Sequence, residues 1–330
     1  MNARARLIGI GIGDHIGWGA VAVLALCALP VLAQAPAPAP VEVPPSAGIA
    51  GVLDQGGVTQ LVQEGFTFTE GPVGTADGGL YFTDIPPNRI YHLDSAGKIS
   101  VAYEGTNGAN GLALTKDGEL ASVEGGGKKV TKRAKDGTVT VLTEGAPGMT
   151  LMAPNDLILD AKGGIYFTDP GPFPPVPGRI AYVYYLPAGT KSAVVIDNQN
   201  PLPNGLVLTN DGKTLIVNDT LGTTLWAFDI KPDGTVANKR AFATLRGTPA
   251  GRPSGADGMA IDRDDRVYVA TVTGVQVFDG KGEYFGTIGV PRQPTNVAFA
   301  GPGKQTLFIT ARQGLYRVNM LAKGPDRLGK

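Results

Sequence analysis

The sequence predicts an all-β fold, a six-bladed β-propeller closed by an N-terminal strand that completes the last blade. Its 330 residues include 48 Gly and 26 Pro and show no long amphipathic helical pattern. This composition favours short strands joined by tight turns. A hairpin signature that recurs six times, and a strand-like segment near the N-terminus that resembles two later ones, support the same prediction.

The hairpin signature is a turn rich in Gly, Asp or Lys that leads into an apolar, β-branched or aromatic strand. Because each copy stands at a similar distance from the next, we interpret the copies as equivalent parts of repeated units. The six copies are Ala76–Asp84, Lys116–Glu124, Ala161–Asp169, Asn210–Asp219, Arg263–Thr271 and Pro302–Ala311.

A polar residue stands seven positions before the turn residue in every copy, at the start of a second expected strand. A constant offset in six copies indicates equivalent positions in six structural units. The separations between these residues are 40, 45, 49, 53 and 39, which is the size of a four-stranded propeller blade. We call them the six anchors: Glu70, Asn110, Asn155, Asn204, Asp257 and Asn296.

Closure of the ring is predicted from a third recurring segment. Val58–Gly65 resembles Ile99–Gly105 and Val139–Gly145, and we expect all three to be outermost strands. The last repeat, from Asn296 to Asn319, has room for only three strands. We therefore expect the N-terminal copy to complete it, which would leave no exposed sheet edge.

The N-terminus has the layout of a signal peptide. Arg4 and Arg6 precede an apolar run from Trp18 to Ala33, which ends among small residues. This predicts a periplasmic or secreted protein, with an uncleaved anchor as the alternative. The only cysteine, Cys27, lies in this leader, so disulfides are not expected. The expected organisation is a signal peptide at 1–35, a Pro/Ala-rich linker at 36–50 and a catalytic propeller at 51–325.

Charge and residue usage exclude several classes of function. Lys plus Arg and Asp plus Glu number 29 each, which gives no reason to expect nucleic acid or an anionic membrane as a partner. A small substrate that is neutral or weakly charged fits better, and the oligomeric state is left open. Beyond the leader the one histidine is His92, expected on an outer strand. The sequence beyond the leader therefore lacks the residues needed for Ser-His-Asp catalysis, for Cys-His catalysis and for a histidine-based zinc site.

The anchors should meet at one mouth of the central channel, because the first strand of each propeller blade lines that channel. Two carboxylates and four amides form a set of hard oxygen ligands, suited to Ca²⁺ or Mg²⁺ rather than Zn²⁺. The alternative is that these Asn and Asp residues only cap turns. That alternative does not explain why Glu70 and Asp257 share a repeat position with the asparagines.

Two further features are expected on the same side. The second strands end in Asp84, Glu124, Asp169 and Asp219. Asp169 and Asp219 in particular are candidates for a second layer around the ion, although capping of strand ends would explain all four equally well. The proline-rich loop from Gly171 to Arg179 is expected to form a lid or a pocket wall.

The chain resembles the SMP-30/gluconolactonase/luciferin-regenerating family of calcium-dependent six-bladed propellers. The resemblance extends from Gly65 to Val318. It depends on five motifs: Thr69-Glu70-Gly71-Pro72, Ala153-Pro154-Asn155-Asp156, Pro203-Asn204-Gly205-Leu206, Asp257-Gly258-Met259 and Pro294-Thr295-Asn296-Val297.

The resemblance implies a metal-dependent hydrolase that opens a small lactone, such as a sugar lactone. It implies one divalent cation held by Glu70, Asn155, Asn204 and Asp257, with Asp257 also acting as general base. Ca²⁺ is the first choice, and Mg²⁺, Mn²⁺ and Zn²⁺ are alternatives. Asn110 and Asn296 would then contact the substrate.

Other functions stay open at this point. One is a non-catalytic propeller that serves as a binding scaffold, and another is a relative that cleaves phosphotriesters or aryl esters. The chain also departs from the family pattern. Ala153 stands where animal members carry arginine, and Gly125 stands where some members carry histidine. These two differences predict a wider or less polar pocket.

Overall fold

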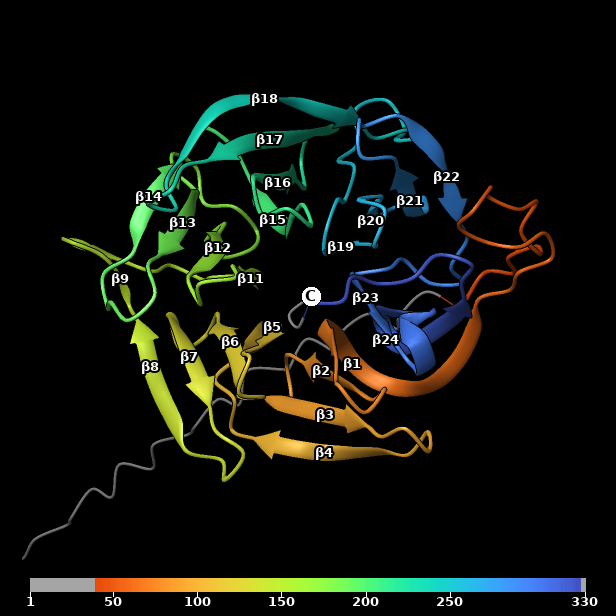
Figure 1. The fold of residues 1–330 in the computed structure, drawn as a ribbon, viewed down its shortest axis with the longest axis horizontal. Coiled ribbons are helices and arrows are strands. Elements are labelled where there is room, and N and C mark those ends of the chain that lie inside the picture. Colours follow the sequence, from red (N-terminus) through yellow and green to blue (C-terminus); the bar gives the residue numbers. More distant parts are fainter. Residues whose placement is uncertain (1–38, 328–330) are drawn as a thin grey trace, which may run out of the picture. The chain divides into compact units, whose positions relative to one another are not determined.

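The computed structural model describes residues 39–327. In this part of the chain the regular structure is 24 β-strands and one short 3₁₀ turn, η1 (Pro302–Lys304). The expectation of an all-β fold is confirmed. Figure 1 shows the sheets arranged around a central axis in a propeller-like manner, with β11, β15, β19 and β23 close to that axis. No helix among the described residues is long and apolar enough to cross a membrane.

Four sheets have four antiparallel strands each, and in each the strands follow one another in chain order. The first contains β5 (Ala109–Leu114), β6 (Leu120–Glu124), β7 (Lys129–Arg133) and β8 (Val139–Thr143). The second contains β11 (Leu157–Leu159), β12 (Ile165–Asp169), β13 (Tyr182–Leu186) and β14 (Val194–Asp197). The third contains β15 (Pro203–Leu208), β16 (Thr214–Asp219), β17 (Thr224–Ile230) and β18 (Val236–Thr244). The fourth contains β19 (Met259–Ile261), β20 (Val267–Thr271), β21 (Gly274–Phe278) and β22 (Tyr284–Ile288). A short hairpin of β9 (Gly145–Ala146) and β10 (Met149–Thr150) precedes β11.

The fifth large sheet has six strands in the order β23, β24, β1, β2, β3, β4. Its strands are β23 (Asn296–Ala300), β24 (Thr306–Asn319), β1 (Gln60–Gly74), β2 (Leu80–Asp84), β3 (Arg89–Leu93) and β4 (Ile99–Glu104). The prediction of six separate blades was therefore wrong, because the described residues form five large sheets.

The reason lies in two long strands that pair in two directions. The first residues of β1 pair with β24, as in Gln60 with Arg317, and its later residues pair with β2, as in Glu70 with Thr83. The register of β1 against β24 shifts between Glu64 and Thr69. Hydrogen bonding thus runs from β23 to β4 through one sheet. Closure by an N-terminal strand that completes a separate last blade stays a prediction.

Burial falls from the inner strands to the outer ones. Every residue of β15 and of β23 is buried, whereas β4 and β8 are largely half-buried or exposed. The predicted outermost strands at 99–105 and 139–145 correspond to β4 and β8, which end their sheets. Among the described residues, aromatic rings pair mainly within a sheet, and one pair joins two sheets: Tyr268 of β20 meets Phe299 of β23 edge to face, with ring centroids 5.1 Å apart. These contacts hold the first strands in place beside the axis.

The segments beyond the sheets also pack. Val41 donates its backbone N–H to the carbonyl of Pro291, and Ile49 is buried, so part of the expected linker lies against the fourth sheet. At the other end Arg327 donates to the carbonyls of Leu208 and Thr209. The predicted signal peptide, residues 1–35, lies outside the described residues, and the domain boundaries stay a prediction.

Candidate functional site

Five of the six anchors lie at or just before the start of an inner strand, and Glu70 lies in the second half of the long strand β1. Asn110, Asn204 and Asn296 belong to β5, β15 and β23, and Glu70 lies in β1. The other two come just before a strand, Asn155 ahead of β11 and Asp257 ahead of β19. The placement of those five anchors matches the expectation drawn from the constant spacing.

Neighbouring anchors contact one another both between sheets and within the six-stranded sheet. Between two sheets, the N–H of Gly111, next to Asn110, donates to the carbonyl of Asn155 at 2.9 Å. Within the six-stranded sheet, Asn296 donates from its side-chain amide to Oε2 of Glu70 at 2.8 Å. A hydrogen bond also links the side chains of Asn204 and Asp257. The anchors therefore form a connected group at one end of the inner strands.

Two glycines that lack a positive φ permit close approaches between neighbouring anchors. A Cβ atom at Gly205 would overlap the carbonyl oxygen of Asp257, and one at Gly258 would overlap the amide of Asn296. Neither glycine has the positive φ that would explain it by backbone conformation alone. Each is therefore needed because a neighbouring anchor passes directly against the backbone.

The ends of three second strands tie one sheet to the next. Thr83, Thr168 and Asn218 donate from their side chains to the backbone carbonyls of anchors in the following sheet. Their acceptors are Asn110 at 3.1 Å, Asn204 at 2.8 Å and Asp257 at 2.5 Å, respectively. Each donor stands immediately before one of the acidic residues that the sequence singled out.

Those acidic residues hold the loops that lead into the anchors of their own sheets. Asp84, Glu124, Asp169 and Asp219 each accept a hydrogen bond from the residue 17 positions earlier in the chain. The donors are backbone N–H groups of Thr67, Met152 and Leu202, and the side-chain amide of Asn107. The capping interpretation of these acids is thus supported, and what they cap is the anchor loop.

Asp169 accepts hydrogen bonds from three different backbone N–H groups. Its carboxylate accepts the N–H groups of Met152 at 2.7 Å, Ala153 at 2.8 Å and Gly171 at 3.2 Å. Burial raises the pKa of Asp169, and the three N–H donors oppose that rise. Asp219 is also buried and accepts the N–H groups of Leu202 and Leu221. Both residues support the backbone around an anchor, and their role as a second layer around an ion stays a prediction.

The electrostatics are most unfavourable at Asp257. Burial raises its pKa well above the ordinary 3.8, and the negative charges of Glu70 and Asp156 add to the rise. The hydrogen bond from Asn204 and the positive charge of Arg312 act in the opposite direction. Several carboxylates thus repel one another near one end of the channel, which a cation would reverse.

Buried amide oxygens complete a donor set for such a cation. Oδ1 of Asn110, Asn204 and Asn218 is buried and accepts no hydrogen bond from the described residues. Within residues 39–327 no three His, Cys, Asp or Glu side chains gather closely enough to hold a metal alone. Amide oxygens would have to contribute, and a mixed carboxylate and amide set fits a hard cation such as Ca²⁺.

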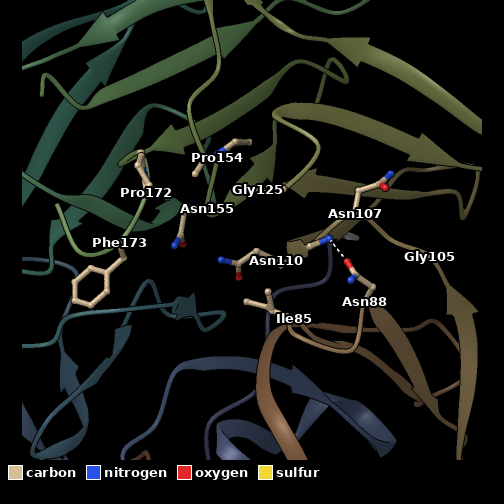
Figure 2. Close-up of a pocket in the computed structure, with 14 residues that line it drawn as sticks. Ile85, Asn88, Gly105, Asn107, Asn110, Gly125, Pro154, Asn155, Pro172 and Phe173 are labelled. Carbon is tan, nitrogen blue, oxygen red and sulfur yellow. Dashed lines mark hydrogen bonds between the residues drawn. The ribbon is translucent and has the colours of Figure 1, made fainter. Parts of the chain in front are cut away.

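A pocket of about 660 Å³ opens beside these residues. Figure 2 shows Asn110 and Asn155 directed toward one another in its middle. Ala153 and Gly125 both line it, as do Gly171, Pro172 and Phe173 of the proline-rich loop. The loop was expected to form a lid or wall, and it contributes a wall. None of the 14 lining residues carries a charged side chain.

Not every expected role is supported by the contacts. Asn296 is 1% exposed, its amide N–H₂ is engaged by Glu70, and its Oδ1 accepts the N–H of Val297. Its contact with substrate stays a prediction, and in this structure it positions Glu70. His92 lies in β3 with its ring 4.5 Å from that of Tyr81, centroid to centroid, in keeping with the packed outer residue expected.

Three further residues belong to the site, although sequence reasoning did not select them. Asp156 acts on Asp257 through its charge, Asn218 holds the carbonyl of Asp257, and Arg312 brings a positive charge near it. Arg312 is itself fixed by Gln293, to which it donates at 2.7 Å. The sequence could have identified two of them, because Asp156 directly follows an anchor and Asn218 directly precedes one of the acidic residues at the strand ends.

Comparison with known proteins gives consistent results. A gluconolactonase of Zymomonas mobilis is 25% identical over 312 residues, covering 81% of this chain and 82% of the relative. Lactonase drp35 of Staphylococcus aureus strain RF122 is 29% identical, covering 75% of this chain and 81% of the relative. Among solved structures, a gluconolactonase of Xanthomonas campestris superposes with a TM-score of 0.74 at 29% identity, covering 87% of this chain and 99% of that one.

The family model agrees with these likenesses. The model described as the SMP-30/Gluconolactonase/LRE-like region matches residues 68–313, which include all six anchors. The resemblance inferred from the sequence motifs is thereby confirmed. This chain belongs to the SMP-30/gluconolactonase/LRE-like family.

Proposed function

We propose that this protein is a hydrolase of carboxylic ester bonds that opens a small, uncharged lactone with the help of a divalent cation. The observation that carries the proposal is the connected group of anchors, in which carboxylates and unpaired amide oxygens meet beside an uncharged pocket. The lactonase and gluconolactonase relatives support the same reaction class.

Glu70, Asn155, Asn204 and Asp257 would hold the cation. Calcium is our first choice because the available donors are oxygens and include amides, whereas His and Cys ligands are lacking among the anchors. Mg²⁺, Mn²⁺ and Zn²⁺ are the alternatives. When bound, the cation would supply Lewis-acid polarisation of the substrate carbonyl and offset the negative charge that develops on its oxygen.

The protein's own residues would supply the proton transfers and the orientation of the substrate. Asp257 takes a proton from the attacking water as the water oxygen bonds to the lactone carbonyl carbon. The bond between that carbon and the ring oxygen then breaks, and the ring oxygen takes the proton back from Asp257 to give the hydroxy acid. Asn110, which lines the pocket, would orient the substrate, while Asn296 keeps Glu70 in place.

The test is a panel of aldonolactones, aryl esters and phosphotriesters assayed with calcium and with a chelator. We expect lactone turnover that the chelator abolishes and that added calcium restores. Turnover of phosphotriesters or aryl esters alone would assign the chain to another hydrolase activity. If calcium stabilised the protein and no ester were hydrolysed, the protein would be assigned as a binding scaffold and not as an enzyme.

We also propose that the protein is exported, on the basis of the leader pattern in its first 35 residues. Fractionation of cells that express the full chain tests this directly. Recovery of a shortened protein in the periplasm or medium is expected, and a full-length protein in the cytoplasm would contradict the proposal.

A further inference from the structure

The pocket extends well beyond the anchors. In Figure 2 the pair Asn110 and Asn155 lies in the middle, Phe173 lies on one side, and Gly105 and Asn107 lie on the other. This second side forms what we call the outer lobe. Its residues are Asn88, Gly105, Asn107, Gly108, Gly125 and Gly126.

We propose that the outer lobe is a binding site for a second, neutral sugar ring attached to the lactone. The inference rests on the proposed lactone hydrolysis and names the class of substrate, a lactone of a disaccharide acid. The reacting ring would lie at Asn110 and Asn155, and the second ring would lie against the glycines.

Size is the first reason. The volume of about 660 Å³ falls within the range of roughly 300–1,000 Å³ that holds drug-sized ligands. At ~30 Å³ per molecule it would hold roughly 22 waters. A lactone of one sugar ring fills only part of that space, so a monosaccharide would leave the outer lobe to water.

The chemistry of the walls is the second reason. No lining residue is charged, so an ionised substituent would find no partner there. Within the outer lobe the side chains are two amides, and the remaining wall is glycine backbone. An alkyl chain would bury little apolar surface against such a wall, whereas hydroxyl groups would find amide and peptide groups to bond.

The two amides are held in place by the protein. Oδ1 of Asn88 accepts the N–H of Gly108 at 2.5 Å, as Figure 2 shows by a dashed line. The side-chain amide of Asn107 donates to Oε2 of Glu124 at 3.0 Å. In both residues one polar atom is engaged and fixes the side chain, and the other is available to a ligand. Fixed donors and acceptors lose less entropy on binding.

A substitution at Gly125 can test whether a ligand binds in the outer lobe. Gly125 has no positive φ, and a Cβ atom there would meet its nearest neighbours, the carbonyls of Pro154 and Gly108, at 3.4 and 3.7 Å. A larger side chain therefore fits the backbone and would occupy the lobe. Gly280 is a matched control, because its Cβ would meet atoms of Asp265 at 3.4 and 3.6 Å and it lies outside this pocket.

The experiment compares kcat/KM for cellobiono-δ-lactone with kcat/KM for glucono-δ-lactone. In Gly125→Phe we expect the ratio to fall by about tenfold or more relative to the wild type, whereas Gly280→Phe should keep the wild-type ratio. An unchanged ratio in Gly125→Phe would overturn the proposal. So would a wild-type enzyme that hydrolyses the glucose lactone and leaves the cellobiose lactone untouched. If Gly125→Phe fails to fold, Gly125→Val is measured in its place, with Gly280→Val as its control.

A binding measurement separates failure of this inference from failure of the proposed function. Calorimetry with cellobiose and with glucose needs no turnover. Tighter binding of cellobiose by the wild type, lost in Gly125→Phe and kept in Gly280→Phe, would uphold the lobe even if no lactone were hydrolysed. Equal binding of the two sugars by the wild type would overturn it, even in a protein that proves to be a lactonase.

Discussion

Replacing Asp169 tests whether the strand-end acids hold the anchor loops. Asp169→Ala leaves the N–H groups of Met152, Ala153 and Gly171 without their acceptor. Each buried group left unpaired costs about 1–3 kcal/mol. Relief of the buried charge, which already raises the pKa of Asp169, offsets part of that. We expect a net loss of about 2–4 kcal/mol in the free energy of unfolding.

Asp169→Asn should cost less, about 1 kcal/mol, because Oδ1 keeps its two donors and only the bond to Met152 is lost. The sign with pH follows from the raised pKa. The folded state holds the proton more tightly than the unfolded state, so the stability from Asp169 is present below about 3.8 and is lost as pH rises through the folded pKa. The cost of Asp169→Asn should therefore shrink over that range.

Urea unfolding gives the stability, and the rise in Tm on adding calcium reports the site. Asp160→Asn is the matched control, because Asp160 accepts the N–H groups of Lys162 and Gly164 at the turn between β11 and β12, in the same sheet. We expect Asp160→Asn to lower stability alone, and Asp169→Asn to lower the calcium-induced rise as well. A cost below about 1 kcal/mol for Asp169→Ala, or equal calcium responses in the two Asn variants, would refute the reasoning.

Three further outcomes are expected. Asp257→Asn should abolish most lactone turnover, and full activity would contradict the role of Asp257 as base. In chelator, at pH values above the raised pKa of Asp257, the same substitution should stabilise the protein, because it removes a charge that Glu70 and Asp156 repel. Thermal unfolding across pH checks this stabilisation. Asn218→Leu should lower kcat more than it raises KM and lower the free energy of unfolding by about 1 kcal/mol, since the bond to the carbonyl of Asp257 is lost. Asn218→Ser should recover part of the lost kcat. Unaltered kinetics in Asn218→Leu would contradict the positioning role. Calcium at 100 times its Kd should stabilise the wild type by about 2.7 kcal/mol, and a Tm that calcium leaves unmoved would argue against the ion.

The spacing of polar residues was enough to predict the inner strands and the group of anchors. A fixed offset from anchor to turn reflects one hairpin of constant length, and this is local information that a sequence carries. The number of sheets is not local. Whether β1 pairs with β24 and β2 in one sheet depends on a shift of register between Glu64 and Thr69, and no repeat spacing records it.

The donors that tie one sheet to the next were hidden from sequence reasoning for the same reason. Thr83, Thr168 and Asn218 act across the boundary between two sheets, so their partners lie 27, 36 and 39 residues away. These distances differ because the connections between sheets differ in length, which hides the repeat. The neighbouring acidic residues act within one sheet, and each accepts its bond from a donor at a constant separation of 17 residues. The sequence nevertheless shows only the acid and does not identify the N–H group that donates to it.

The two kinds of contact together explain how repulsive groups stay near one another. Carboxylates that repel, as Glu70 and Asp156 repel Asp257, would separate if their loops could relax. The backbone at Asp257 is held instead by Asn218 of the preceding sheet. The loop ahead of Asn204 is held by Asp219 of the same sheet. These two bonds act on the backbone and do not occupy the side chain of Asp257 or of Asn204. Repulsion between carboxylates that destabilises the fold is expected at a site where those carboxylates are to bind a cation.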